Sequence, residues 1–283
     1  MPPDRPVYEV AFVLGGGGVL GAHEVGMLRA LAECGVRPDV ILGTSVGAIN
    51  GAFFADDPTL AGVERLTELW RSANLADRSP GMVLRRVTTL ARSGTHLQSL
   101  TEMRNRLTAV LPARRVEELS VPFQCVAASI ERAAEHWFDS GPLADVVLAS
   151  CAVPGILPPV RIDGEHFIDG GIVNSIPVSR AVTLGARRIY VLQVGRLEQA
   201  LKPPRWPWEV GLVAFEVARR HRFAHDLHSL PPDVELHVLP TGGSAAPAYN
   251  DLSGQLHVGR IARTVERQID SAYEASRQYL VET

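Results

Sequence analysis

Ser45 lies in a five-residue pattern that is typical of a catalytic nucleophile. The segment from Gly43 to Gly47 reads G-T-S-V-G, a G-x-S-x-G pattern, between a predicted strand over 39–42 and a predicted helix over 48–55. A sharp strand-to-helix turn needs small residues beside it and lifts the serine hydroxyl clear of the backbone. The start of the following helix favours negative charge on that oxygen. In this context the pattern indicates a nucleophile elbow rather than an ordinary turn.

A glycine-rich segment over 15–21 (GGGGVLG) also lies between a predicted strand, 8–14, and a predicted helix, 21–34. Consecutive glycines let backbone N–H groups converge on an anion at a helix start. The anion could be a dinucleotide pyrophosphate, but that motif needs an acid at the end of the second strand, and Asp39 lies at its start. An oxyanion hole for acyl transfer fits better, because both loops then reach one edge of a parallel sheet. A third alternative is that the glycines only permit close helix–sheet packing.

Asp169 is the acid that could activate the serine. It ends a short predicted strand and is followed by Gly170 and Gly171, which would leave its carboxylate unshielded in a tight loop. A general base and a plain Asp-Gly turn both fit this pattern, and spacing alone does not decide between them. The turn is the better interpretation for Asp163, in a predicted hairpin over 160–167.

The alternation of strands, turns and helices predicts an α/β fold with a parallel sheet. Further strands are predicted at 121–129, 135–138, 188–194 and 234–239, and further helices at 143–151, 177–184, 208–227 and from about 254 to the end, with a mostly helical stretch over 59–119. No repeat occurs, and neither proline- or glycine-rich stretch in the last third separates two cores. The sequence therefore predicts one domain.

Composition narrows the function classes. The 28 Lys and Arg against 31 Asp and Glu give a net charge of −3, and 46% of residues are apolar, which is typical of a globular protein and leaves no basic surface for nucleic acid. Three scattered cysteines, Cys34, Cys125 and Cys151, predict neither disulfides nor a zinc site. The polar N-terminal segment and the lack of any run of about 18 apolar residues lead us to expect a reduced, cytoplasmic protein without a membrane span.

Taken together, these segments resemble the patatin-like phospholipase family, whose motifs are GGGxxG, G-x-S-x-G and D-G-[GA] in this order. Here they fall at 16–21, 43–47 and 169–171. The segments 149–154 (ASCAVP), with L-P-P at 157–159, and 173–178 (VNSIPV) also look like the family's sequence on either side of D-G-G. The resemblance covers about 7–194, and the joint occurrence of the motifs is much more specific than any one of them.

The resemblance implies a three-layer α/β/α fold with a central, mostly parallel sheet and a Ser–Asp dyad. Ser45 would be the nucleophile and Asp169 the base, with Gly170 and Gly171 in the Asp loop and Gly43 and Gly47 flanking the serine. The oxyanion hole would be formed by the loop of Gly16, Gly17, Gly18 and Val19. The whole chain, 1–283, would be a single acyl hydrolase domain with a motif-bearing core over about 7–194 and a helical C-terminal portion over about 206–283.

Such a protein would hydrolyse a lipid or other hydrophobic carboxylic ester through an acyl-Ser45 intermediate, with no metal and no cofactor. Neither its oligomeric state nor the ester is readable from the sequence. The stretch 70–111 would be an acyl-chain wall or lid, or simply packed helices with a solvated face. The segment 206–212, with two tryptophans, could touch a membrane surface, but a core helix is the favoured interpretation.

One position departs from the family pattern. The family often has Lys or Arg just before the last glycine of the loop, and this chain has Leu20. Backbone donors do not depend on that cation, so we expect activity to survive. Leu20 is nevertheless the one feature that points to the alternative of a non-catalytic lipid-binding or regulatory module.

A Ser-His-Asp hydrolase is a further rival, because five histidines follow the serine in the last third of the chain: His221, His225, His228, His237 and His257. It is disfavoured because the elbow follows the second strand, directly after the glycine loop. Most of these histidines lie at polar positions of predicted helices, as solvated or capping residues do.

Overall fold

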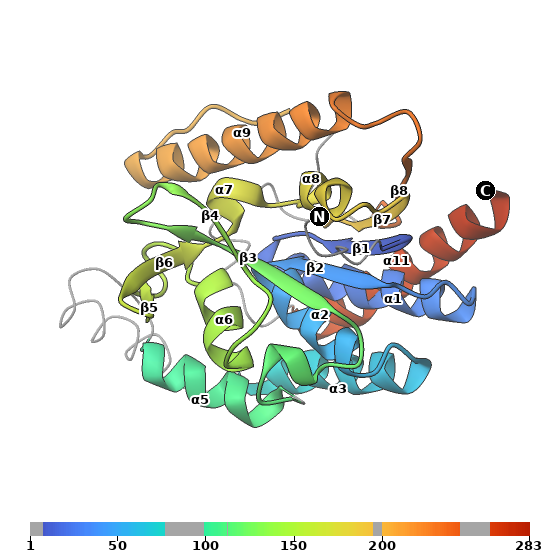
Figure 1. Ribbon diagram of the computed structural model, residues 1–283, viewed down its shortest axis with the longest axis horizontal. Coiled ribbons are helices and arrows are strands. Elements are labelled where there is room, and N and C mark those ends of the chain that lie inside the picture. The colour runs from blue at the N-terminus through green and yellow to red at the C-terminus, as the bar shows by residue number, and fades with distance from the viewer. Residues whose placement is uncertain (1–7, 77–98, 112, 195–199, 244–260) are drawn as a thin grey trace, which may run out of the picture.

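The computed structural model describes residues 8–76, 99–111, 113–194, 200–243 and 261–283. Within them, one sheet of 8 strands runs through the molecule with helices on both faces (Figure 1). The strands are β1 (Val10–Leu14), β2 (Val40–Thr44), β3 (Phe123–Ser129), β4 (Ala134–Phe138), β5 (Val160–Ile162), β6 (Glu165–Asp169), β7 (Arg188–Leu192) and β8 (Glu235–Val238).

The strand order is β5-β6-β3-β2-β1-β7-β8, with β4 paired to β3 beside this path. Along β3-β2-β1-β7-β8 every neighbouring pair of strands is parallel. In contrast, β4 and β6 each pair antiparallel with β3, and β5 pairs antiparallel with β6. The expected central, mostly parallel sheet is therefore confirmed. The turn between β5 and β6 has positive φ at both Asp163 (49°) and Gly164 (87°), as the predicted tight hairpin requires.

The central strand β1 is buried on both sides, which explains its continuous apolar sequence. Phe12 and Leu14 belong to one apolar cluster, while Ala11 and Val13 belong to another on the opposite face. The larger cluster packs under α1 (Ala22–Glu33), α2 (Val46–Asp56), α3 (Leu60–Ala76), α5 (Leu100–Val110), α6 (Leu143–Ser150) and α11 (Ile261–Glu282). The other face carries α7 (Gly171–Asn174), α8 (Val178–Thr183) and α9 (Pro207–His228), so the three-layer arrangement is confirmed (Figure 1).

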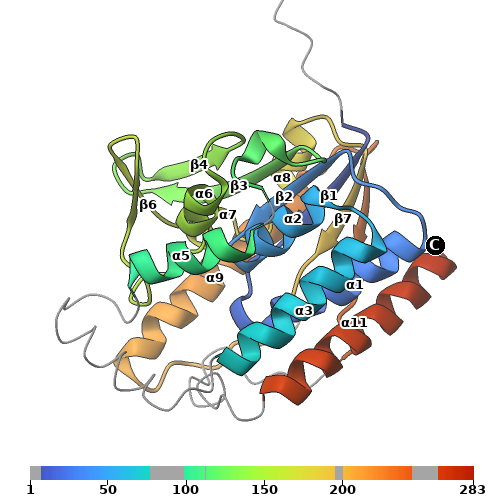
Figure 2. The ribbon, with the colours of Figure 1, turned by 90° about the horizontal axis from the view of Figure 1, so that it is seen from below.

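The helix α11 packs along α1, next to α3 (Figure 2). At Gly26 of α1 the two backbones approach so closely that an added Cβ would lie 2.1 Å from the carbonyl oxygen of Ile269. Ile269, Val265 and Ala272 are buried against the large cluster. The predicted C-terminal helix is thus a structural part of the layer beneath the sheet.

Several expectations concern residues outside the described ranges. These include 77–98, which hold most of the stretch considered as a lid, and 244–260, at the expected start of the last helix. Of that stretch, Trp70 is described: its indole N–H donates to Asn50 Oδ1 at 2.9 Å, and its ring lies against Gly21, so it packs with the core. Trp206 is 57% exposed, unlike a core residue, whereas the side chains of Trp208 and Leu212 are outside the description.

None of the helices in the described ranges is both long and apolar enough to cross a membrane. Likewise, the described His, Cys, Asp and Glu side chains form no group of three or more that could hold a metal ion.

The close approach at Gly26 can be tested with a matched pair of helical glycines. Gly26→Ala should lower the free energy of unfolding by about 1–3 kcal/mol, because backbone atoms of α11 must move to admit the methyl group. Gly211, in α9, has open space around a Cβ, so Gly211→Ala should raise stability by about 0.5–1 kcal/mol through helix propensity. Urea unfolding measures both. Equal effects of the two substitutions would contradict the packing of α11 on α1.

Candidate active site

The turn between β2 and α2 carries Ser45 in a strained backbone conformation. Ser45 has φ 54° and ψ −122°, and α2 begins at the next residue, two residues earlier than the sequence pattern predicts. Both flanking positions require glycine, because neighbouring backbone atoms lie too close to admit a Cβ. A Cβ on Gly43 would lie 2.6 Å from the Ala48 Cα, and a Cβ on Gly47 would lie 2.3 Å from the Leu14 carbonyl oxygen. The turn is therefore the sharp elbow that the sequence predicts.

Asp169 ends β6 and is 3% exposed. Its Oδ2 accepts a hydrogen bond from Ser45 Oγ at 2.7 Å, and its Oδ1 accepts the Gly171 N–H at 2.7 Å. Burial raises the pKa of Asp169 to about 6, although the hydrogen bonds from Ser45 and Gly171 oppose that shift. Such a carboxyl is ionised at neutral pH and remains basic enough to take a proton.

Strand β3 brings the two side chains together. Thr44, the residue before Ser45, pairs with Val126 of β3, and Asp169 pairs with the next residue, Ala127. The serine and the aspartate therefore lie next to each other along one edge of β3, where β6 follows the end of β2, while β4 pairs along the other edge. A carboxylate 124 positions away along the chain thus reaches the serine hydroxyl.

The end of α6 holds both partners, a role that the sequence alone did not assign to it. Ser150 Oγ accepts the Ser45 N–H at 2.9 Å, and the Cys151 thiol lies 3.0 Å from the Ser45 carbonyl oxygen as a donor. On the other side, the Asp169 N–H donates to the Ala152 carbonyl at 3.0 Å, and the Gly170 N–H donates to the Ser150 carbonyl at 3.2 Å. The sequence predicts the helix over 143–151, and the resemblance of 149–154 to the family's segment ahead of D-G-G is the signal that points to the site.

The glycine loop lies beside Ser45, as predicted. A Cβ on Gly16 would lie 3.5 Å from the Ser45 Cβ. The Gly16 N–H donates to the Ser175 carbonyl at 2.9 Å, so this amide is engaged within the protein. Of the four residues expected to form an oxyanion hole, Gly17, Gly18 and Val19 remain as candidate donors. Val19 is 51% exposed, so this part of the loop faces solvent.

A buried polar cluster supports the glycine loop from below. Asn50 of α2 donates to Glu24 Oε2 at 2.7 Å and to the Gly21 carbonyl at 2.9 Å. Burial holds the pKa of Glu24 well above its usual range, despite the hydrogen bond from Asn50. His23 contacts the Leu20 carbonyl at 2.9 Å. His23 and Glu24, to which the sequence pattern assigns no role, thus tie the start of α1 to the loop and to α2.

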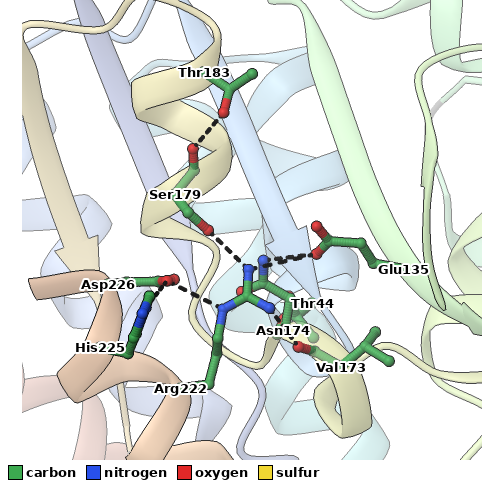
Figure 3. A network of polar contacts seen from close by, with 9 residues as sticks. All are labelled: Thr44, Glu135, Val173, Asn174, Ser179, Thr183, Arg222, His225 and Asp226. Atoms are coloured by element: carbon green, nitrogen blue, oxygen red, sulfur yellow. Dashed lines mark hydrogen bonds and ion pairs between the residues drawn. The ribbon is translucent and has the colours of Figure 1, made fainter. Parts of the chain in front are cut away.

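A second polar network links α9 to the elbow from the opposite face of the sheet (Figure 3). Arg222 of α9 donates to Asp226 Oδ1 at 3.1 Å, to Ser179 Oγ at 3.1 Å and to the Val173 carbonyl at 3.4 Å. In α7, Asn174 donates to Glu135 at 2.9 Å and its carbonyl accepts the Thr44 hydroxyl at 2.9 Å. Figure 3 shows these side chains converging between α8, α9 and the end of β2.

The histidines considered as triad members are engaged elsewhere where their contacts are described. His237 contacts Glu235 at 2.9 Å and Tyr279 at 3.2 Å, and His228 contacts the Ala224 carbonyl. His257 lies outside the described residues. Asp169 reaches Ser45 directly, with no imidazole between them.

The strain at Ser45 should appear as a stability difference between two substitutions that both remove the hydroxyl. Ser45→Gly relieves the positive φ, whereas Ser45→Ala keeps a Cβ in the same conformation. We expect the glycine variant to be more stable by about 1 kcal/mol. Thermal and urea unfolding of the two variants measure this. A more stable alanine variant would show that the elbow is unstrained.

Comparisons with known proteins agree with these motifs. A family model described as "Patatin-like phospholipase" matches residues 12–182. The chain is 33% identical over 192 residues to "Patatin-like phospholipase domain-containing protein 7" of Rattus norvegicus. The aligned residues make up 67% of this chain but 14% of that protein. It is 30% identical over 189 residues to "Lysophospholipase nte1" of Emericella nidulans, and this alignment covers 67% of this chain and 12% of that protein. The match thus spans a small part of these curated relatives.

Among solved structures, VipD from Legionella pneumophila aligns with a TM-score of 0.44 and 15% sequence identity, over 98% of this chain and 67% of that one. The family match covers all three motifs: the glycine loop, the G-x-S-x-G elbow and the D-G-G segment. The resemblance predicted from the sequence is therefore confirmed, and the chain belongs to the patatin-like phospholipase family.

Proposed function

We propose that this protein is a carboxylic ester hydrolase acting on lipids, with Ser45 as nucleophile and Asp169 as general base. The observation that carries the proposal is the 2.7 Å hydrogen bond between Ser45 Oγ and Asp169 Oδ2 at the edge of the glycine loop. A serine hydroxyl needs a neighbouring base to attack a carbonyl carbon. Here the base is a buried carboxylate, and the elbow presents the hydroxyl to it.

The two carboxylate oxygens of Asp169 have separate tasks. Oδ1 holds the Gly171 N–H, which fixes the orientation of the carboxylate, and Oδ2 takes the proton from Ser45 Oγ as that oxygen attacks the ester carbonyl. The protonated Asp169 then gives this proton to the departing alkoxide, leaving an acyl-Ser45. In the second half, Asp169 takes a proton from water, the resulting hydroxide attacks the acyl carbon, and Ser45 regains its proton as the acid leaves.

The negative oxygen of each tetrahedral intermediate would be bound by loop amides. Gly17, Gly18 and Val19 are the donors we assign, since the Gly16 amide already bonds to the Ser175 carbonyl. Loss of one such donor typically costs about 10²–10³ in rate. No metal or cofactor takes part in this scheme.

A hydrophobic substrate is supported by the side chains around the site. The three segments that meet at Ser45 each carry an exposed apolar residue: Val19 in the glycine loop, Ile172 after Asp169, and Val153 with Ile156 after α6. Exposed apolar side chains beside a catalytic serine suit acyl chains or a lipid surface. Relatives named as phospholipase domain proteins and a lysophospholipase support the same substrate class. We infer that these residues are where the protein would contact a lipid surface.

The dyad is tested by ester hydrolysis. Ser45→Ala and Asp169→Asn should each lower kcat for p-nitrophenyl esters by about 10³-fold or more, because the first removes the nucleophile and the second removes its base. Asp163→Asn is the matched control: Asp163 lies in the β5–β6 turn at φ 49°, a conformation that asparagine tolerates, so this variant should keep full activity.

The comparison should use acyl chains of increasing length and phospholipid vesicles, with folding checked by circular dichroism. A folded wild-type protein that binds vesicles but hydrolyses no ester faster than Ser45→Ala would refute the hydrolase. The non-catalytic lipid-binding module would then be the better description.

The pH dependence follows from the raised pKa of Asp169. The base works only when ionised, so kcat/KM should reach half its plateau at about pH 6 and fall tenfold per unit below it. An unshifted aspartate would place this limb at about pH 4. Rates measured with p-nitrophenyl butyrate at constant ionic strength give the profile. A flat profile between about pH 5 and pH 8 would contradict Asp169 as the base.

A further inference from the structure

Helix α9 lies outside the segment that matches the family model, yet three of its residues touch the catalytic loops. Phe215 packs against Gly171, where an added Cβ would lie 3.0 Å from the phenyl ring. Arg219 reaches the Gly16 carbonyl oxygen at 3.5 Å, and Arg222 reaches the Val173 carbonyl oxygen at 3.4 Å. Because these residues are spaced by four and three positions, they share one face of the helix. That face spans both the glycine loop and the Asp loop.

Arg219 is the buried member of this set. Its side chain is 3% exposed, and it forms a two-point ion pair with Glu216, with Nε–Oε1 at 2.8 Å and Nη2–Oε2 at 3.2 Å. Glu216 is 1% exposed and also receives Arg220 at 3.2 Å. Taking a guanidinium out of water is costly, and Glu216 offsets this cost while holding the planar group in one orientation. The remaining nitrogen, Nη1, is the one directed at Gly16.

The Gly16 carbonyl belongs to the same peptide group as the Gly17 N–H. In a trans peptide the C=O and N–H bonds point in opposite directions, so a cation that holds the carbonyl on one side fixes where the N–H points on the other. A positive charge near the carbonyl oxygen also polarises the peptide and makes its N–H a stronger donor. The Gly16 N–H is held as well, by the Ser175 carbonyl at 2.9 Å, so Gly16 is anchored at both ends.

We propose that Arg219 is a positioning residue for ester hydrolysis, which orients and polarises the Gly16–Gly17 peptide so that the Gly17 N–H stabilises the oxyanion. This inference rests on the proposed function. The loop over 15–21 contains no charged residue of its own, with Leu20 next to its last glycine. The cation at the Gly16 carbonyl belongs to α9. Arg222, bonded to α7 as Figure 3 shows, provides a second anchor for the helix.

The alternative is that Arg219 only pairs with Glu216 and stabilises α9. The two roles differ in what they change. A purely structural pair affects the free energy of unfolding, whereas an oriented oxyanion donor affects the transition state and any ligand that carries an anionic oxygen at Ser45. An alkyl trifluoromethyl ketone is such a ligand, because Ser45 adds to its carbonyl carbon and leaves a negatively charged hemiketal oxygen.

The test compares Arg219→Gln, Arg219→Lys and the matched control Arg220→Gln, which removes the other guanidinium on Glu216. For each, kcat and KM on p-nitrophenyl butyrate, the inhibition constant of the trifluoromethyl ketone and the melting temperature are measured. Arg219→Gln should lower kcat about ten- to a hundredfold, below the loss of a whole donor, with KM changed less than about twofold. Inhibition should weaken by the same factor, Arg219→Lys should recover part of both, and Arg220→Gln should stay near wild type.

Three results overturn the inference. The first is a melting temperature that falls in Arg219→Gln while kcat and inhibition stay unchanged; the second is an equal loss of kcat in Arg220→Gln. The third is a loss of kcat that differs in size from the loss of inhibition by the trifluoromethyl ketone. If Arg219→Gln does not fold, the same comparison is made with Arg219→Lys. A wild-type protein without esterase activity instead refutes the proposed function, and this inference with it.

Discussion

The hydrogen bond between Ser45 and Asp169 depends on one constraint, the register in which β2 and β6 pair along the same edge of β3. The serine follows the β2 residue paired with Val126, and the aspartate sits on β6 opposite Ala127. A slip of one residue in the pairing of β2 or β6 with β3 would turn one of the two side chains to the opposite face. The antiparallel pairing of β6 with β3, just beyond the last residue of β3 that pairs with β2, is what gives the carboxylate this place.

Burial of Asp169 raises its pKa at a cost in stability. The native state holds a proton on this carboxyl more tightly than the unfolded chain does, so its contribution to stability falls as the pH rises from about 4, the usual aspartate value, to about 6. The hydrogen bonds from Ser45 and Gly171 limit the cost, and the end of α6 keeps the surrounding backbone in place through Ser150. The strained serine and the buried acid are thus held by the same short segment.

The strands and the motif-bearing loops were predictable because each depends on a pattern of residues that are neighbours in sequence. Apolar runs bounded by glycine predict β1 and β2, and Asp163-Gly164 predicts the hairpin. The contacts of Ser150 and Arg219 were not predictable, since each depends on the folded path of the chain rather than on neighbours in sequence. Nothing in the local sequence of α9 tells that Arg219, among the arginines of that helix, is the one that reaches Gly16. Asp169 lies between these cases: its loop was recognisable and the family resemblance paired it with Ser45, but spacing alone did not decide between a base and a plain turn.

The packing of α11 on α1 has a consequence for the order in which this protein can be completed during synthesis. The helix that follows the glycine loop leaves the ribosome long before Ile269, whose backbone closes over Gly26. At roughly 5–20 residues per second, the apolar side of α1 stays uncovered for on the order of ten seconds or more. During that interval the nascent chain presents a hydrophobic surface to chaperones and to other nascent chains. The arrival of α11 thus governs how long this side of α1 is exposed to aggregation.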